Sequence, residues 1–140
     1  MSGPSWKANQ DFLATAVACA KSTTVTNVTD FTSRSIRVSR GIHYSGEFCL
    51  LTITFTRTTG TSSEVDFEFQ ASFDDGTTWC TDAFIKISIA TNRTAVSNVV
   101  RHCSVELIPG VSHLRLYRIV NNDASTDLTA CNATLSIGGD

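Results

Sequence analysis

Residues 65–72 read Val-Asp-Phe-Glu-Phe-Gln-Ala-Ser, an unbroken alternation of apolar and polar side chains. Successive side chains of a β-strand point to opposite faces, so this segment predicts a strand that is buried on one face only. The side chains expected on the buried face are Val65, Phe67, Phe69 and Ala71. Those expected to face water are Asp66, Glu68, Gln70 and Ser72.

Similar alternation predicts strands elsewhere in the chain. Residues 51–56 alternate Leu, Ile and Phe with Thr, and the loop 58–64 that follows contains Gly60. We therefore predict that 51–56 and 65–72 form a hairpin. The other predicted strands cover residues 84–89, 99–107, 114–120 and 128–137, with two more near Val25 and Ile36.

The number and spacing of these strands define the expected fold. No window of the chain has the i, i+3, i+4, i+7 spacing of an amphipathic helix, and 140 residues suit one domain. About seven or eight short strands separated by turn residues predict an all-β protein, an antiparallel β-sandwich, with a closed barrel as the alternative.

The start of the chain lacks this alternation. We expect residues 1–22 to form an extended N-terminal arm and residues 23–140 to form the β-sandwich domain. The arm contains an apolar run at 12–20 that resembles a short signal peptide, but Lys7 and Asp11 balance each other before it, so we expect it to stay on the protein. Its apolar residues are predicted to bind a partner; they are Trp6, Phe12, Leu13 and Val17.

The most specific local pattern spans residues 72–79 and resembles the Asp-box, S-x-D-x-G-x-T-W. Its defined positions are Ser72, Asp74, Gly76, Thr78 and Trp79. We expect Asp74 to accept hydrogen bonds from backbone N–H groups, Gly76 to adopt positive φ, and Trp79 to fold over the loop. In sialidases and related propellers the box recurs several times and lies away from the active site. A single copy therefore predicts a structural turn, and an EF-hand calcium loop is not predicted because its acidic spacing is absent.

Composition and motifs exclude several functions. The net charge of −2 includes no long run of one sign, so nucleic-acid binding is not expected, and no stretch approaches the roughly 20 apolar residues of a membrane span. The five cysteines lie far apart, which predicts thiols and no metal site. The three histidines lie in separate segments and no catalytic motif occurs, so we expect neither an enzyme nor a cofactor.

The stretch 50–79, together with 118–123, resembles small β-rich structural proteins of tailed bacteriophages, in which a strand like 65–74 runs into a turn closed by Trp. The resemblance implies a capsid decoration or head-to-tail connecting protein, with other virion proteins as partners and a homo-oligomeric state. It also implies a location in the virion, and in the host cytoplasm during assembly. The alternative is a carbohydrate-binding or adhesin β-sandwich module, for which exposed aromatic side chains are few.

Overall fold

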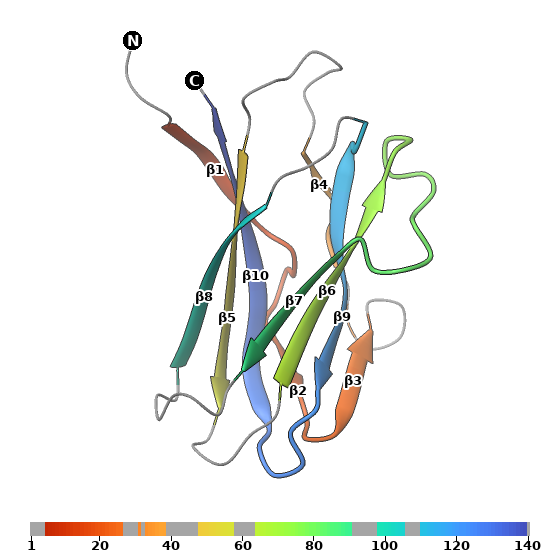
Figure 1. Cartoon of the computed structure of the whole chain (residues 1–140). Coiled ribbons are helices and arrows are strands. Elements are labelled where there is room, and N and C mark those ends of the chain that lie inside the picture. Colours follow the sequence, from red (N-terminus) through yellow and green to blue (C-terminus); the bar gives the residue numbers. More distant parts are fainter. Residues whose placement is uncertain are drawn as a thin grey trace.

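The alternating segments form two antiparallel sheets that pack face to face in this computed structural model (Figure 1). The structure describes residues 5–26, 31, 33–38, 48–57, 64–90, 98–105 and 110–139, and within them it contains ten strands and no helix. The first sheet has the order β1 (Ser5–Asp11), β10 (Leu128–Gly139), β5 (Phe48–Arg57) and β8 (Asn98–Val105), with β2 (Val17–Cys19) also paired with β10. The second has the order β3 (Thr23–Thr26), β9 (His113–Asn121), β6 (Glu64–Ser72) and β7 (Ile85–Ala90), with β4 (Ile36–Arg37) also paired with β9.

This arrangement confirms the predicted antiparallel β-sandwich and corrects one strand pairing. The hairpin predicted between 51–56 and 65–72 is wrong, because β5 pairs with β10 and β8 whereas β6 pairs with β7 and β9. The two strands are consecutive in sequence but belong to opposite sheets. Both are central strands, so their alternating apolar residues face each other across the core.

The N-terminal segment is part of the sandwich, so the predicted arm and the boundary at residue 22 need correction. β1 and β2 pair with β10 one after the other along its length. Both segments thus depend on contacts with a strand at the other end of the chain. The side chain of Trp6 and residues 1–4 lie outside the described residues, while Val17 is half-buried beside the core.

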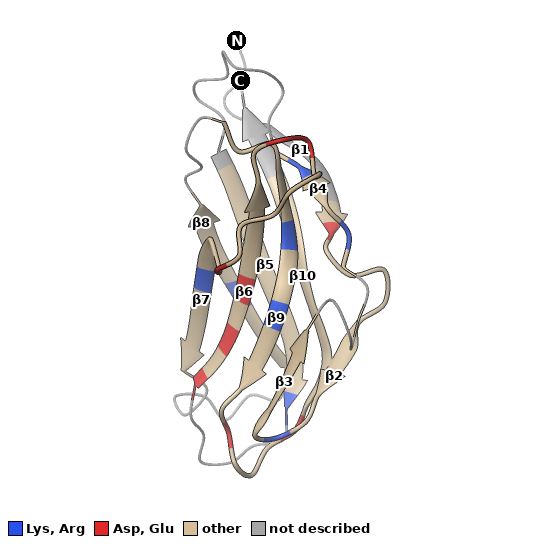
Figure 2. Cartoon of the chain, turned by 90° about the vertical axis from the view of Figure 1, so that its right-hand side faces the viewer, with Lys and Arg blue, Asp and Glu red and all other residues tan. Residues whose placement is uncertain are grey.

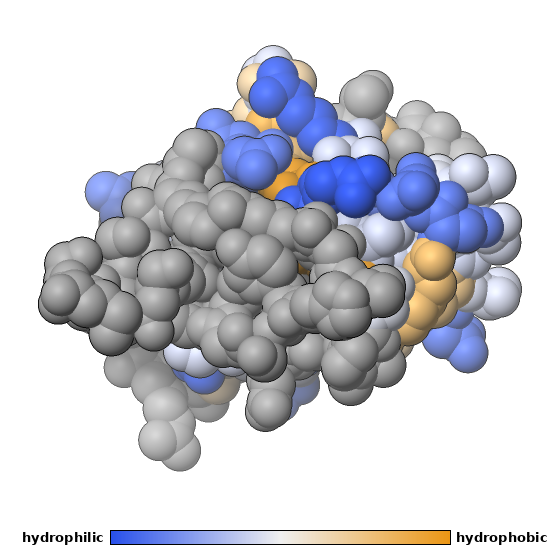
Figure 3. Space-filling view, turned by 90° about the horizontal axis from the view of Figure 1, so that it is seen from above, coloured by the Kyte–Doolittle hydropathy of each residue, from blue (hydrophilic) through white to orange (hydrophobic). Residues whose placement is uncertain are grey.

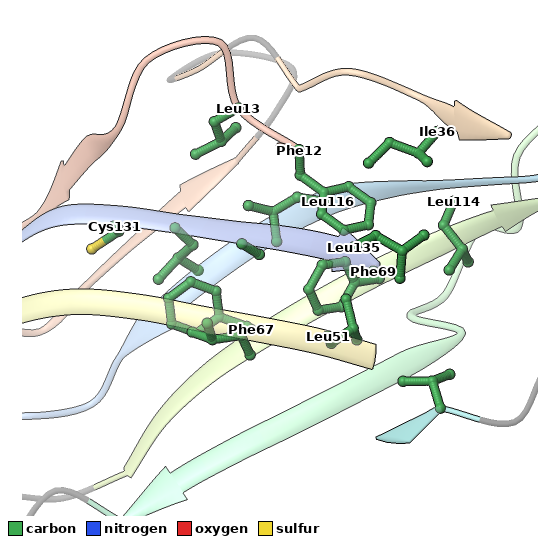
Figure 4. Close-up of a cluster of buried hydrophobic side chains, with 14 of the residues drawn as sticks. Phe12, Leu13, Ile36, Leu51, Phe67, Phe69, Leu114, Leu116, Cys131 and Leu135 are labelled. Carbon is green, nitrogen blue, oxygen red and sulfur yellow. The ribbon is translucent and has the colours of Figure 1, made fainter. Parts of the chain in front are cut away.

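Phe12 and Leu13 link the two sheets instead of binding a partner. The Phe12 side chain has no exposed surface, and its ring lies 5.0 Å from that of Phe69 in β6 (Figure 4). The Phe12 N–H donates to the carbonyl of Ala133 in β10, at 2.8 Å. The Asn132 side-chain amide accepts from the N–H of Leu13 at 3.2 Å and donates to its carbonyl at 3.3 Å. These bonds fix an irregular segment whose apolar side chains complete the core.

The turn between β9 and β10 is closed by polar side chains that are buried. Asn121 donates its amide N–H groups to the carbonyls of Cys19 and Thr126, at 3.2 and 2.9 Å. Asp123 accepts from the N–H groups of Ser125 and Thr126, at 2.8 and 3.1 Å. These contacts satisfy the turn's backbone groups and give the segment 118–123 a structural role.

Candidate partner-binding faces

The Asp-box residues form a closed turn between β6 and β7. Ser72 Oγ donates to Asp74 Oδ1 at 2.8 Å and accepts from the N–H of Gly76 at 2.9 Å. Asp74 Oδ1 also accepts from the N–H of Thr78 at 2.7 Å, and these hydrogen bonds, that from Thr78 above all, lower the pKa of Asp74. Gly76 has φ of 85°, a region that L side chains rarely adopt.

Trp79 lies at the end of this turn beneath a guanidinium group. The Arg115 Cζ atom is 4.3 Å from the centre of the Trp79 ring, which is a cation–π contact. One face of the ring is therefore already covered, which leaves it poorly placed to stack on a sugar. Phe55, Phe67 and Phe69 lie in the core and offer no exposed ring to a glycan either.

The outer surface of the second sheet is charged and largely satisfied by its own residues, as the bands of both signs on β6, β7 and β9 show (Figure 2). We call it the charged face; its residues are Asp66, Glu68, Gln70, Lys86, Ser88, Arg115 and Arg118. Glu68 accepts from Arg118 Nε and Nη2, at 2.7 and 3.1 Å. This hydrogen bond raises the pKa of Arg118.

The other polar residues of β6 also form hydrogen bonds or ion pairs with side chains of β7 and β9. Gln70 Oε1 accepts from Arg115 Nε at 3.0 Å. Asp66 accepts from the Ser88 hydroxyl at 2.7 Å, and Lys86 Nζ lies 3.7 Å from its carboxylate. The prediction that this face of β6 is open to water is wrong, because the long side chains of β7 and β9 lie over it. Glu68 retains only 5% of its exposed surface.

The outer surface of the first sheet is built differently. Because Leu51, Ile53 and Phe55 are buried, the alternate residues of β5 point away from the core, and their partners on β8 and β10 point the same way. We call this surface the uncharged face. Its residues are Leu50, Thr52, Thr54 and Thr56 of β5, Asn98, Val100, His102 and Ser104 of β8, and Asn132, Thr134 and Ser136 of β10.

Three hydroxyl groups of the uncharged face have partners within the sheet. Thr52 Oγ1 and His102 Nδ1 lie 3.0 Å apart, within hydrogen-bond distance. Thr56 Oγ1 donates to Asn98 Oδ1 at 3.1 Å, and Thr134 donates to the carboxylate of Asp11 at 2.8 Å. The face thus combines short β-branched side chains, three hydroxyl groups that have partners, and the exposed Val100. It is flanked by the charged Asp11 of β1.

Large exposed apolar side chains are few in the described part of the chain. They are Val100, which is 57% exposed, and Phe73 in the Asp-box turn, which is 49% exposed. Seen along the strands from the upper end of Figure 1, the described surface is mostly hydrophilic with small separate apolar patches (Figure 3). Of the two exposed side chains, Val100 lies on the outer strand β8 of the first sheet and Phe73 lies on a turn.

Ser112, His113 and Asp75 lie together at the Asp-box turn, but they are not positioned for nucleophilic catalysis. Ser112 Oγ lies 3.1 Å from His113 Nδ1, but it is buried, donates to the carbonyl of Ser72 and accepts from the N–H of Asp75. Burial and then the nearby Arg37 lower the pKa of His113. The Ser112 hydroxyl therefore closes a turn, and it is not positioned to attack a substrate.

Other chemical groups are accounted for in the same way. In the part of the chain that the structure describes, no three His, Cys, Asp or Glu side chains gather as a metal site would require. All five cysteines are thiols, and burial raises the pKa of Cys131 to about 12. Among the described residues there is no helix with the length and apolar character needed to cross a membrane.

Comparison with known proteins finds similarity to a solved viral structure. No protein-family model and no curated protein sequence matches the chain. Among solved structures it is similar to the crystal structure of the infectious bursal disease virus VP2 subviral particle, with a TM-score of 0.46 and 12% sequence identity. The match covers 97% of this chain and 33% of that chain, so the protein spans about a third of its neighbour's length.

The uncharged face was not identified from the sequence. The threonines at 52, 54 and 56 are visible there as the polar side of a strand. What the sequence does not show is that β8 and β10 flank this strand in register and extend its uncharged surface.

Proposed function

We propose that this chain is a structural protein of a virus particle that binds neighbouring protein subunits and catalyses no reaction. The supporting observation is the uncharged face, which crosses β10, β5 and β8 without a Lys, Arg, Asp or Glu among its residues. The centres of protein interfaces are depleted of charged residues, because burying a charge is costly even when it is paired. A neighbouring subunit could cover this face at a lower desolvation cost than the charged face.

The resemblance of the stretch 50–79, together with 118–123, supports a more specific proposal. We propose a capsid decoration or head-to-tail connecting protein of a tailed bacteriophage, located in the virion and, during assembly, in the host cytoplasm. Its partners would be other virion proteins. We propose no direct contact with nucleic acid or membrane.

The test is incorporation into particles. Particles encoded by the same genome would be purified with the wild-type chain, with Thr54→Lys on the uncharged face, or with Thr24→Lys on the outer side of β3 as the matched control. Mass spectrometry would then measure the copies of the chain per particle. We expect wild type and Thr24→Lys to be present at equal occupancy and Thr54→Lys to be largely lost. Particles without the wild-type chain, or with undiminished Thr54→Lys, would contradict the proposal.

A further inference from the structure

We propose that His113 is a proton-sensitive contact, which holds β4 and the Asp-box turn together while its ring is neutral and loosens them when the ring is protonated. β4 is two residues long, and its Arg37 lies opposite His113 of β9. On its other side His113 lies opposite Ser72, the first residue of the Asp-box. The histidine therefore lies between the short strand and the turn. This inference goes beyond the proposed function and does not depend on it.

The ring of His113 packs directly against the Asp-box turn. A Cβ atom added to Gly76 would lie 3.9 Å from His113 Cγ, so the ring borders that glycine. The Nδ1 atom of the ring lies 3.1 Å from Ser112 Oγ, which also accepts from the N–H of Asp75 at 3.0 Å. The histidine is thus connected to the part of the turn that carries the Asp75 carboxylate.

An ion pair bridges β4 and the turn beside this ring. Arg37 Nη2 lies 3.0 Å from Asp75 Oδ1. A protonated ring would place a second cation next to the pair, where it would repel Arg37 and compete with it for Asp75. Burial of the ring and then Arg37 lower the pKa of His113, while Asp75 acts in the opposite direction. The arrangement therefore favours the neutral ring.

The other described charges nearby do not compensate a proton on His113. Arg115 lies two residues along β9 on the same side of the strand and is stacked on Trp79. The carboxylate of Asp74 accepts hydrogen bonds within the turn. The next charged groups along β9 and β6 pair with each other. Together with the bridging ion pair, Arg115 and Asp74 cancel in formal charge, so a proton on His113 leaves an excess positive charge.

The direction of the pH effect follows from these contacts. The pKa of His113 is lowered in the folded protein, so its contribution is present above the unfolded-state value of about 6.5 and is lost as the pH falls through the folded value. Val38 directly follows β4, and its N–H donates to the carbonyl of Ser112 at 2.8 Å. Acidification should therefore expose the Val38 amide while the sandwich stays folded.

Amide hydrogen exchange of the purified full-length chain, followed by NMR at about pH 7.5 and about pH 5, tests the inference, because only histidine side chains ordinarily titrate in this interval. After correction for the intrinsic effect of pH, the protection factor of Val38 should fall by about two- to fivefold on acidification, the range that a surface ion pair allows. In His113→Gln, which has no imidazole to protonate, it should be equal at both pH values. His102→Gln, which removes a histidine from the other sheet, should behave like wild type.

A second variant gives an independent readout. Arg37→Gln removes the cation that opposes protonation, so the NMR shifts of the His113 ring should titrate at a higher pH than in wild type. Circular dichroism would establish that each variant is folded. Three results would overturn the inference: Val38 protection that does not depend on pH in wild type, a pH dependence that persists in His113→Gln, or an unchanged His113 titration in Arg37→Gln.

Discussion

The two outer faces of the sandwich differ in how their polar side chains find hydrogen-bond or ion-pair partners. On the charged face, β6 places Asp66 and Glu68 outward, and cationic side chains from β7 and β9 lie over them. On the uncharged face, β5 places threonines outward, and they bond sideways to neighbouring strands. One face is covered by its own side chains, whereas the other stays flat and can be covered by another protein.

This difference has an energetic consequence for binding. A partner on the charged face would have to desolvate or break ion pairs that are complete within the chain. A partner on the uncharged face would displace water from methyl groups and from hydroxyl groups that keep their partners. We therefore predict that removing a charge from the charged face lowers the free energy of unfolding, whereas adding a charge to the uncharged face weakens binding to a partner.

The largest effect is expected in the core that holds both faces in place. Phe12→Ala should lower the free energy of unfolding by about 3 to 5 kcal/mol, because it removes a fully buried ring between the sheets. Chemical denaturation measures this loss. Phe73→Ala, at a position that is 49% exposed and forms an edge-on ring pair with Phe84, is the control and should cost no more than about 1.5 kcal/mol. If Phe12→Ala were as stable as wild type, the N-terminal segment would be a separate arm after all.

The Asp-box turn lies beside the charged face and should affect folding without affecting association. Gly76→Val should cost about 1 to 3 kcal/mol, because the φ of 85° is strained for a β-branched residue. Asp74→Ala should also destabilise the protein, and that loss should depend on pH. The pKa of Asp74 is lowered in the folded state, so its contribution is present above the unfolded-state pKa and disappears as the pH falls through the folded value. Thermal unfolding of Asp74→Ala and wild type at neutral and strongly acidic pH would show a constant difference if this account is wrong.

Matched substitutions on the two faces test the comparison itself. Glu68→Ala should cost about 1 to 2 kcal/mol, because it leaves the Arg118 guanidinium, whose side chain is 40% exposed, to be solvated by water alone. Thr52→Val, which keeps the shape of the side chain, should cost less than about 0.5 kcal/mol. Urea denaturation gives both values. Equal losses would mean that the two faces do not differ in how they stabilise the fold.

The smallest expected differences are those in the reactivity of the cysteine thiols, which can be compared without a substitution. Burial raises the pKa of Cys131 to about 12, so its thiol should resist alkylation in the native protein. Cys103 and Cys80 are half-buried and should react first. After unfolding without a reductant, mass spectrometry should find at least four of the five cysteines labelled. One labelled cysteine or none would show that the cysteines are joined by disulfides in the native protein.

The sequence predicts strand positions well because alternation is a local property of each strand. It does not predict pairing, which depends on contacts between distant segments; the false hairpin between 51–56 and 65–72 is an example. Burial of Glu68 was missed for a similar reason, since Arg118 is supplied by a strand fifty residues away. Phe12 looked like part of a separate arm because an irregular segment that completes a core has no periodic pattern.

The most direct test of the difference between the faces is hydroxyl-radical footprinting of the wild-type chain in its assembled form, with the dilute free chain as the reference. The probes are Leu50 and Val100 on the uncharged face, and Trp79 and Tyr117, whose rings lie beside Arg115 and Arg118 of the charged face. We predict that Leu50 is protected on assembly while Trp79 and Tyr117 are modified as in the monomer. Protection of Trp79 and Tyr117 with unchanged modification of Leu50 would show that the charged face is the binding surface, and would contradict this account.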